Sequence, residues 1–194
     1  MKIIRQIEVY APDYLGVMDV LIAGDKIIAL EEALSGGYAE LEVEEISGSG
    51  KVLTPGFIDC HFHLLGGGGE GGFQNRTPEV TLSQLTTAGV TTVVGCLGTD
   101  GEGRDMTALI SKAKGLEAEG ISTYVYEGSY RLPIKTVTDS IIKDFLTIDK
   151  IIGIGEIAVS DHRSSQPTFE EFSRATADAR VGGMLSGKAG IVNV

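Results

Sequence analysis

The stretch PGFIDCHFHLLGGGGEGG, residues 55–72, is the part of the sequence that says most about the fold and the possible site of this chain. It begins as a short apolar run, carries two of the chain's three histidines at the end of that run, and continues into a string of glycines. Successive residues of a strand point to opposite faces, so His61 and His63 project to one side while Phe62 faces away. Two imidazoles that converge in this way suit the first ligands of a zinc-type ion. The alternative is that both histidines lie at a polar rim of the fold, with their hydrogen bonds satisfied and no ligand bound.

The glycine string after the histidines has its own chemistry. Residues 66–69 are all glycine, and Glu70 follows them directly. Such a loop lets the backbone approach a ligand closely and presents N–H groups, and Glu70 adds a carboxylate at the mouth of a site. A flexible loop with a solvated acid is the competing interpretation. The loop is not a Walker-type phosphate loop, because the Lys-Ser/Thr ending is missing.

The pattern after Pro55 predicts a parallel α/β fold. Short apolar runs recur, and their hydrophobicity is continuous rather than alternating, which is typical of strands covered on both faces. The runs cover 56–64, 89–98, 120–129 and 151–160, and a fifth begins at 189–194.

Amphipathic segments with helix start and stop signals separate these runs. The segment 77–89 has Thr77 as its predicted cap, and the segment 168–183 opens with a Thr168-x-x-Glu171 capping box. Two further helices are expected within 104–120 and 136–150.

Four consecutive βα units result from this pattern. A doubly wound sheet could close on four units, whereas a (β/α)8 TIM barrel needs about 250 residues and eight strands. In the barrel interpretation the chain is therefore the N-terminal part of a barrel. Residues 1–50 alternate like half-buried strands, including one within 41–56. We expect a small β-sandwich-type domain over 1–52 and the first half of the barrel over 53–194.

Composition narrows the class of partner. The 194 residues are 42% hydrophobic and carry 16 basic against 27 acidic side chains, a formal net charge of −11. No basic run suggests nucleic acid or an anionic membrane, so small molecules or proteins are the expected partners. Cys60 and Cys96 lie in apolar runs, which favours a reducing compartment, although a disulfide stays possible. Neither a signal peptide nor a membrane span is indicated, and we expect a cytoplasmic protein.

Polar residues mark the ends of the later apolar runs, where parallel α/β folds place their chemistry. Thr99 follows the second run, Tyr130 the third, and Glu156 and Arg163 lie in and after the fourth. A carboxylate in an apolar strand is costly to bury unless it is paired or binds a metal, so Glu156 is a candidate ligand. Arg163 suits a substrate carboxylate, or else a local pair with Asp161.

Three stretches together resemble one known family. PGFIDCHFHLLGGGGEGG, TPEVTLSQLTTAGVTTVVGCLGTD and GEIAVSDHRSSQPTFEE are similar to the amidohydrolase superfamily, and within it to the isoaspartyl dipeptidases, also called β-aspartyl peptidases. The pattern PGFID-x-H-x-H alone would fit the whole superfamily. The glycine string with Glu70, the Gly-Thr-Asp turn and the Ser-Asp-His-Arg-Ser segment narrow the resemblance to this family.

The resemblance implies a binuclear zinc centre in which His61 and His63 bind the more buried ion. The family commonly has a carboxylated lysine, bridging both ions, where this chain has Glu156. Glutamate keeps the charge but is shorter by about 3 to 4 Å, which leaves the identity and number of the metals open while Glu156 stays an expected ligand.

The same resemblance implies the roles of the other site residues. Glu70 would bind the α-ammonium group of a β-aspartyl dipeptide, Tyr130 would polarise the scissile carbonyl, and Arg163 would hold a carboxylate. Gly68 and Thr99 would also contact the substrate. Hydrolysis would then proceed by attack of a metal-bound hydroxide on the amide carbonyl.

The family takes two more histidine ligands and its catalytic aspartate from later strands, which this sequence does not contain. The resemblance therefore implies an activity that is complete only with a C-terminal half, supplied by a complementing chain or within a homo-oligomer. A non-catalytic half-barrel fragment is one alternative. A cyclic-amide hydrolase of hydantoinase or dihydroorotase type is another, but Glu70 with Arg163 suits a dipeptide better.

Overall fold

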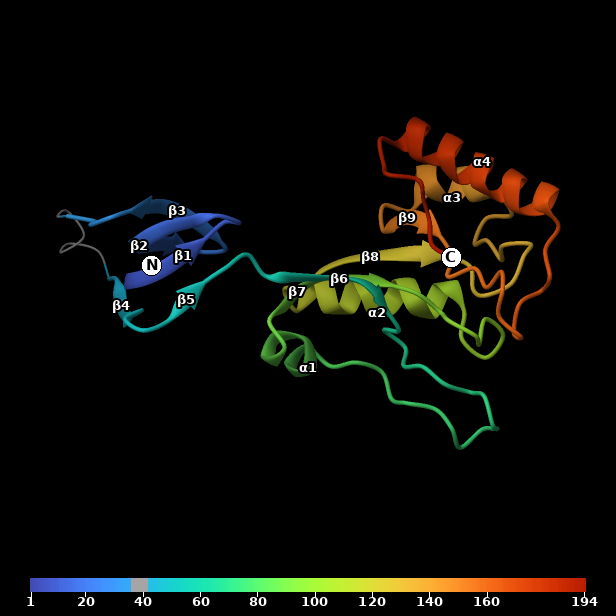
Figure 1. Cartoon of the computed structure of the whole chain (residues 1–194), viewed down its shortest axis with the longest axis horizontal. Coiled ribbons are helices and arrows are strands. Elements are labelled where there is room, and N and C mark those ends of the chain that lie inside the picture. Colours follow the sequence, from blue (N-terminus) through green and yellow to red (C-terminus); the bar gives the residue numbers. More distant parts are fainter. Residues whose placement is uncertain (36–41) are drawn as a thin grey trace. The chain divides into compact units, whose positions relative to one another are not determined.

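The computed structural model describes residues 1–35 and 42–194. Contacts divide the chain into two compact units, Met1–Gly56 and Phe57–Val194 (Figure 1). Leu41, the first residue of the strand expected within 41–56, lies outside the described residues.

The first unit is one mixed sheet in the order β3-β2-β1-β4, with β5 also paired to β1. Its antiparallel pairs are β1 with β2 and β2 with β3, whereas β4 and β5 run parallel to β1. In β1, Ile7 and Val9 are buried in one cluster with Glu8 exposed between them, which agrees with the alternating pattern of the sequence. Ile3 packs in a separate cluster, beyond a register irregularity between Ile4 and Ile7. The expected separate β unit is therefore confirmed as a single sheet among the described residues, while its expected bounds of 1–52 stay a prediction. Its strands are β1 (Lys2–Tyr10), β2 (Tyr14–Ala23), β3 (Lys26–Glu31), β4 (Glu44–Ser47) and β5 (Val52–Leu53).

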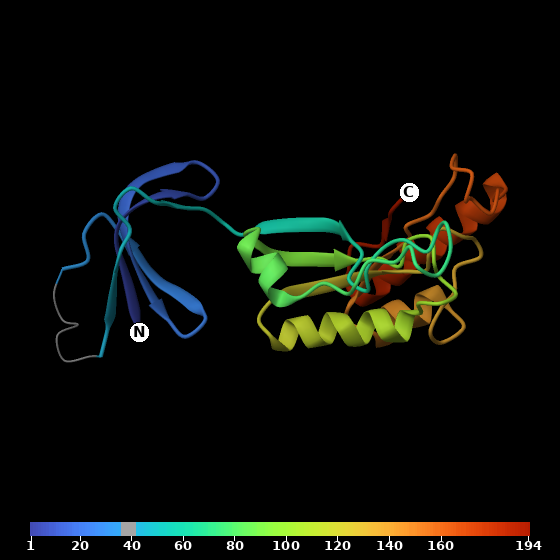
Figure 2. The ribbon, with the colours of Figure 1, turned by 90° about the horizontal axis from the view of Figure 1, so that it is seen from below.

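The second unit is a curled parallel sheet in the order β10-β9-β8-β7-β6, with a helix between each strand and the next (Figure 2). The predicted α/β class and the four βα units of a half-barrel are confirmed. The strands are β6 (Phe57–Phe62), β7 (Val90–Gly95), β8 (Ser122–Glu127), β9 (Ile151–Ile154) and β10 (Ile191–Val192). The helices are α1 (Leu82–Thr87), α2 (Met106–Ala118), α3 (Ile141–Thr147) and α4 (Phe169–Ser186).

The main core lies between the helices and one face of this sheet. Val93 and Val125 of the sheet pack there with Leu109 of α2 and Phe145 of α3, all fully buried. The other face carries a second apolar cluster of Val94, Cys96 and Tyr126, with partly buried Ile152 and Ile191 packed against it. Apolar residues on both faces account for the continuous runs in the sequence.

The helix caps confirm one prediction and correct another. Thr168 and Glu171 form the expected reciprocal capping box of α4. Thr77 is not a helix cap, because α1 begins only after Thr81. The Thr77 hydroxyl instead accepts a hydrogen bond from the N–H of Gly67 at 2.7 Å, and the Thr77 N–H donates to the Gly67 carbonyl. Pairing with the glycine loop thus keeps this segment out of the helix.

Among the described helices, none combines the length and the apolar character that crossing a bilayer requires.

Candidate metal centre and substrate pocket

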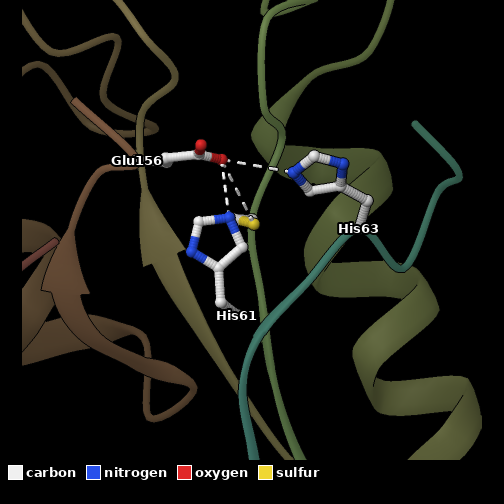
Figure 3. A group of neighbouring side chains, drawn as sticks. His61, His63 and Glu156 are labelled. Atoms are coloured by element: carbon white, nitrogen blue, oxygen red, sulfur yellow. Dashed lines mark hydrogen bonds and ion pairs between the residues drawn. The ribbon is translucent and has the colours of Figure 1, made fainter. Parts of the chain in front are cut away.

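His61, His63 and Glu156 converge on one point at the carboxyl end of the parallel sheet (Figure 3). His61 lies in β6 and His63 just after it. The Nε2 atoms of His61 and His63 lie 2.8 and 3.2 Å from the same oxygen, Oε2 of Glu156. The two histidines therefore face one side, as the spacing predicts, and the shorter glutamate side chain reaches both.

Glu156 lies beyond its strand rather than inside it. Strand β9 ends at Ile154, so the sequence-based placement of this carboxylate within an apolar strand is wrong by two residues. Its side chain is 17% exposed. Burial raises the pKa of Glu156, but the hydrogen bond from His63 and the charge of His61 oppose this and hold the pKa below its ordinary value. The carboxylate is therefore ionised at neutral pH.

Cys96 joins this group from the neighbouring strand. Its N–H donates to the Phe62 carbonyl at 2.9 Å, which sets Cys96 beside the end of β6. Its buried Sγ lies 3.9 Å from Oε2 of Glu156. Burial and the Glu156 carboxylate raise the pKa of the thiol. One ligand atom each of His61, His63, Cys96 and Glu156 lies within 4.8 Å of the others.

The sequence pattern places Cys96 in an apolar run and gives it no role in the site. Its position one residue beyond β7, next to the end of the histidine-bearing strand, is the signal that could have identified it.

Glycines shape the surroundings of His63. A Cβ on Gly98, whose φ is +72°, would lie 2.8 Å from Cε1 of His63. The N–H groups of Gly66, Gly67 and Gly69 donate to His63, Thr77 and Asn75 within the chain. These N–H groups therefore build the loop, in contrast to the expectation that the string presents them to a ligand. Gly68 lies in the same loop, bridged to Arg76.

A second cluster joins Glu70, Thr99 and Arg163. The Thr99 hydroxyl donates to Oε1 of Glu70 at 3.1 Å, and Nη1 of Arg163 donates to the same oxygen. The hydrogen bonds from Arg163 and Thr99 lower the pKa of Glu70. Arg163 also pairs with both carboxylate oxygens of Asp161, at 2.7 and 2.8 Å. The local pair that the sequence left open is therefore present, and Nη1 still points to Glu70.

Tyr130 links the two clusters. Its ring centroid lies 4.8 Å from Cζ of Arg163. Burial and the Glu156 carboxylate raise the pKa of the Tyr130 phenol. Both Tyr130 and Glu156 line a cavity of about 290 Å³ that also reaches Asp161 and Arg163. A larger cavity of about 690 Å³ lies beside His61, His63 and the glycine loop.

Comparison with known proteins identifies the relatives of this chain. The β-aspartyl dipeptidase of Fervidobacterium islandicum AW-1, solved with a β-Asp-Leu dipeptide, is 55% identical with a TM-score of 0.91 over 99% of this chain and 50% of its own. Imidazolonepropionase of Ectopseudomonas mendocina is 30% identical over 60% of this chain and 30% of its own length. Dihydropyrimidinase of Brevibacillus agri, at 20% identity and a TM-score of 0.57, covers 92% of this chain and 38% of its own and shares the fold. No family model matches the chain.

The half-barrel fold and these relatives indicate the class of protein: the chain is similar to enzymes of the amidohydrolase superfamily. Within that superfamily it is similar over nearly its whole length to the β-aspartyl dipeptidases. The chain spans about half the length of the dipeptidases that it matches.

Proposed function

We propose that this chain forms the first half of a zinc-dependent hydrolase that cleaves β-aspartyl dipeptides. The observation that carries the proposal is the pairing of two clusters through Tyr130. One cluster gathers His61, His63 and Glu156, and the other sets an acid and a base, Glu70 and Arg163, side by side. A dipeptide offers an ammonium and a carboxylate that these two charges complement.

The residues present fit a divalent metal. Two imidazole nitrogens lie within 3.2 Å of one carboxylate oxygen, and nitrogen and oxygen donors in this combination are those that Zn²⁺ takes in catalytic sites. We assign His61, His63 and Glu156 as ligands, with two ions per complete site. When bound, such ions lower the pKa of water and polarise the substrate carbonyl.

The other residues bind and orient the substrate. Glu70 accepts hydrogen bonds from the α-ammonium group, Arg163 holds a carboxylate, and Gly68 and Thr99 contact the dipeptide backbone. Tyr130 donates its O–H to the scissile carbonyl oxygen, and its raised pKa keeps that proton in place at neutral pH. The catalytic aspartate and further ligands belong to the C-terminal half of the barrel, from a complementing chain or another copy. Free Cys60 and Cys96 favour the reducing cytoplasm as its location.

A complementation assay tests this function. This chain is mixed with the C-terminal half of the Fervidobacterium islandicum dipeptidase to give a completed barrel, and release of leucine from β-Asp-Leu is measured with added Zn²⁺. We expect turnover that is lost with a His61→Ala, His63→Ala double variant. Native mass spectrometry of this chain reports the bound metal in parallel.

The alternative functions give different results in the same assay. A completed barrel that opens a hydantoin faster than it cleaves β-Asp-Leu would replace the dipeptidase by a cyclic-amide hydrolase. A chain that pairs with the second half but neither binds metal nor supports turnover would be a non-catalytic fragment.

A further inference from the structure

Cys96 is buried in an apolar cluster, but its thiol also lies beside the proposed metal ligands. Its neighbours on the inner face of the sheet, Val94 and Tyr126, are apolar, and a small apolar residue would fill this place equally well. The sulfur nevertheless lies 3.9 Å from the oxygen of Glu156 that both histidines face.

The charge balance between the proposed ligands and a divalent ion gives a reason for a thiol at this position. As metal ligands the two imidazoles are neutral, so they and one carboxylate supply a single negative charge from the described residues, while each divalent ion brings two positive charges. A thiolate is an anionic ligand that Zn²⁺ and Co²⁺ accept readily, whereas Mg²⁺ and Ca²⁺ prefer oxygen. Cys96 can therefore add a second negative charge from the strand between the histidines and Glu156.

We propose that Cys96 is a metal ligand, so that this half-barrel binds a thiophilic divalent cation through two nitrogens, one oxygen and one sulfur. The inference rests on the proposed metal centre and goes beyond it by naming a ligand from the end of β7 and the class of metal. The thiol proton passes to solvent as the metal–sulfur bond forms.

The competing role is a positioning one, in which the thiol only donates a weak hydrogen bond to Glu156. Serine separates the two roles, because its hydroxyl retains the hydrogen bond but not the sulfur ligand. Cys60, in β6 and exposed, is the matched control, since the chain has two cysteines in all.

The test is a titration of the purified chain with Co²⁺, recorded in the visible and near ultraviolet. Visible cobalt bands report binding to the site, and a near-ultraviolet sulfur-to-cobalt charge-transfer band reports a thiolate ligand. We expect both in the wild-type chain and in Cys60→Ser, whose remaining thiol is Cys96. Cys96→Ser should lose the charge-transfer band and bind Co²⁺ at least roughly tenfold more weakly.

Each other result has a defined meaning. Visible bands without charge transfer in Cys60→Ser would overturn the role of Cys96 and leave the histidine and glutamate site standing. This arm does not depend on whether Cys96→Ser folds. Persistence of the charge-transfer band in Cys96→Ser would also overturn the inference. Absence of every cobalt band in the wild-type chain would overturn both the inference and the proposed metal centre.

Discussion

Arg163 and Glu70, 93 residues apart in the chain, form an ion pair beside Thr99 and Tyr130. In the proposed function these are the groups that bind the two charged ends of a dipeptide. Without substrate Glu70 is therefore paired with Arg163, which also pairs with Asp161, and the substrate must replace the contact between Glu70 and Arg163 with two of its own. The binding energy of the dipeptide is reduced by the cost of separating the pair.

Glu70→Gln tests the recognition of the ammonium group in the completed barrel. The amide keeps the shape but removes the charge, so we expect KM for β-Asp-Leu to rise roughly tenfold or more. Glu102→Gln is the control, because Glu102 is an exposed acid whose side chain pairs with Lys135 rather than with Arg163. An unchanged KM in Glu70→Gln would remove this role.

Glu156→Ala tests the carboxylate ligand. The variant leaves both imidazoles without the oxygen that they share, and we expect the zinc content of the purified chain to fall, with affinity reduced by roughly 10–100-fold or more. Elemental analysis after dialysis measures it, with Glu102→Gln again as the control. Full retention of zinc would exclude Glu156 from the ligand set.

Gly98→Ala tests how tightly the glycines enclose His63. The added methyl would lie 2.8 Å from the ring, and the positive φ adds backbone strain, so we expect a loss of about 1–3 kcal/mol together with weaker metal binding. Gly187→Ala is a close control, because its φ is +70° and a Cβ there would have nothing within 4 Å among the described residues. Equal thermal shifts in the two variants would show that contact with His63 contributes nothing.

Glu127 in β8, which lies outside the candidate site, should make the free energy of unfolding depend on pH. It is fully buried, and within the described residues neither carboxyl oxygen has a hydrogen-bond partner. Asp144 of α3 is also buried and accepts hydrogen bonds from the N–H groups of Val137 and Thr138, at 2.6 and 3.2 Å. Burial and the nearby Asp144 raise the pKa of Glu127 to about 10. The folded protein therefore keeps a proton that the unfolded chain releases near its ordinary pKa of about 4.3.

This raised pKa sets the sign of the effect. Since the folded state holds the extra proton, the free energy of unfolding decreases as pH rises from about 4 towards about 10. Glu127→Gln removes the titrating group, so we expect its free energy of unfolding to fall less than that of the wild type between about pH 6 and about pH 9. Urea unfolding at both pH values measures this. Parallel curves for variant and wild type would contradict the buried proton.

The order of the elements could be predicted because local rules determine it. Continuous apolar runs identified β6 to β9, and the Thr168 capping box located the start of α4. The prediction of Thr77 as a helix cap was wrong because its hydroxyl can either cap a helix or pair with the Gly67 backbone. Only the folded loop decides between the two. His61, His63 and Glu156 were recognisable from spacing and from resemblance. Cys96 and Glu127 were not, because an apolar run does not reveal which face a side chain occupies.

The proposed ligands are spread over the sheet in a way that couples metal binding to folding. His61 and His63 come from β6 and Glu156 from the end of β9, with β7 and β8 between those strands in the sheet. An ion bound by all three residues would link β6 directly to β9. Backbone hydrogen bonds, in contrast, link each strand only to its immediate neighbours. Unfolding must then release the ion. Metal binding therefore stabilises the native state more as the concentration of free metal rises above the dissociation constant. Chelation should accordingly loosen β6 and β9 first, and the proposed ion would also hold the curvature of the sheet between them.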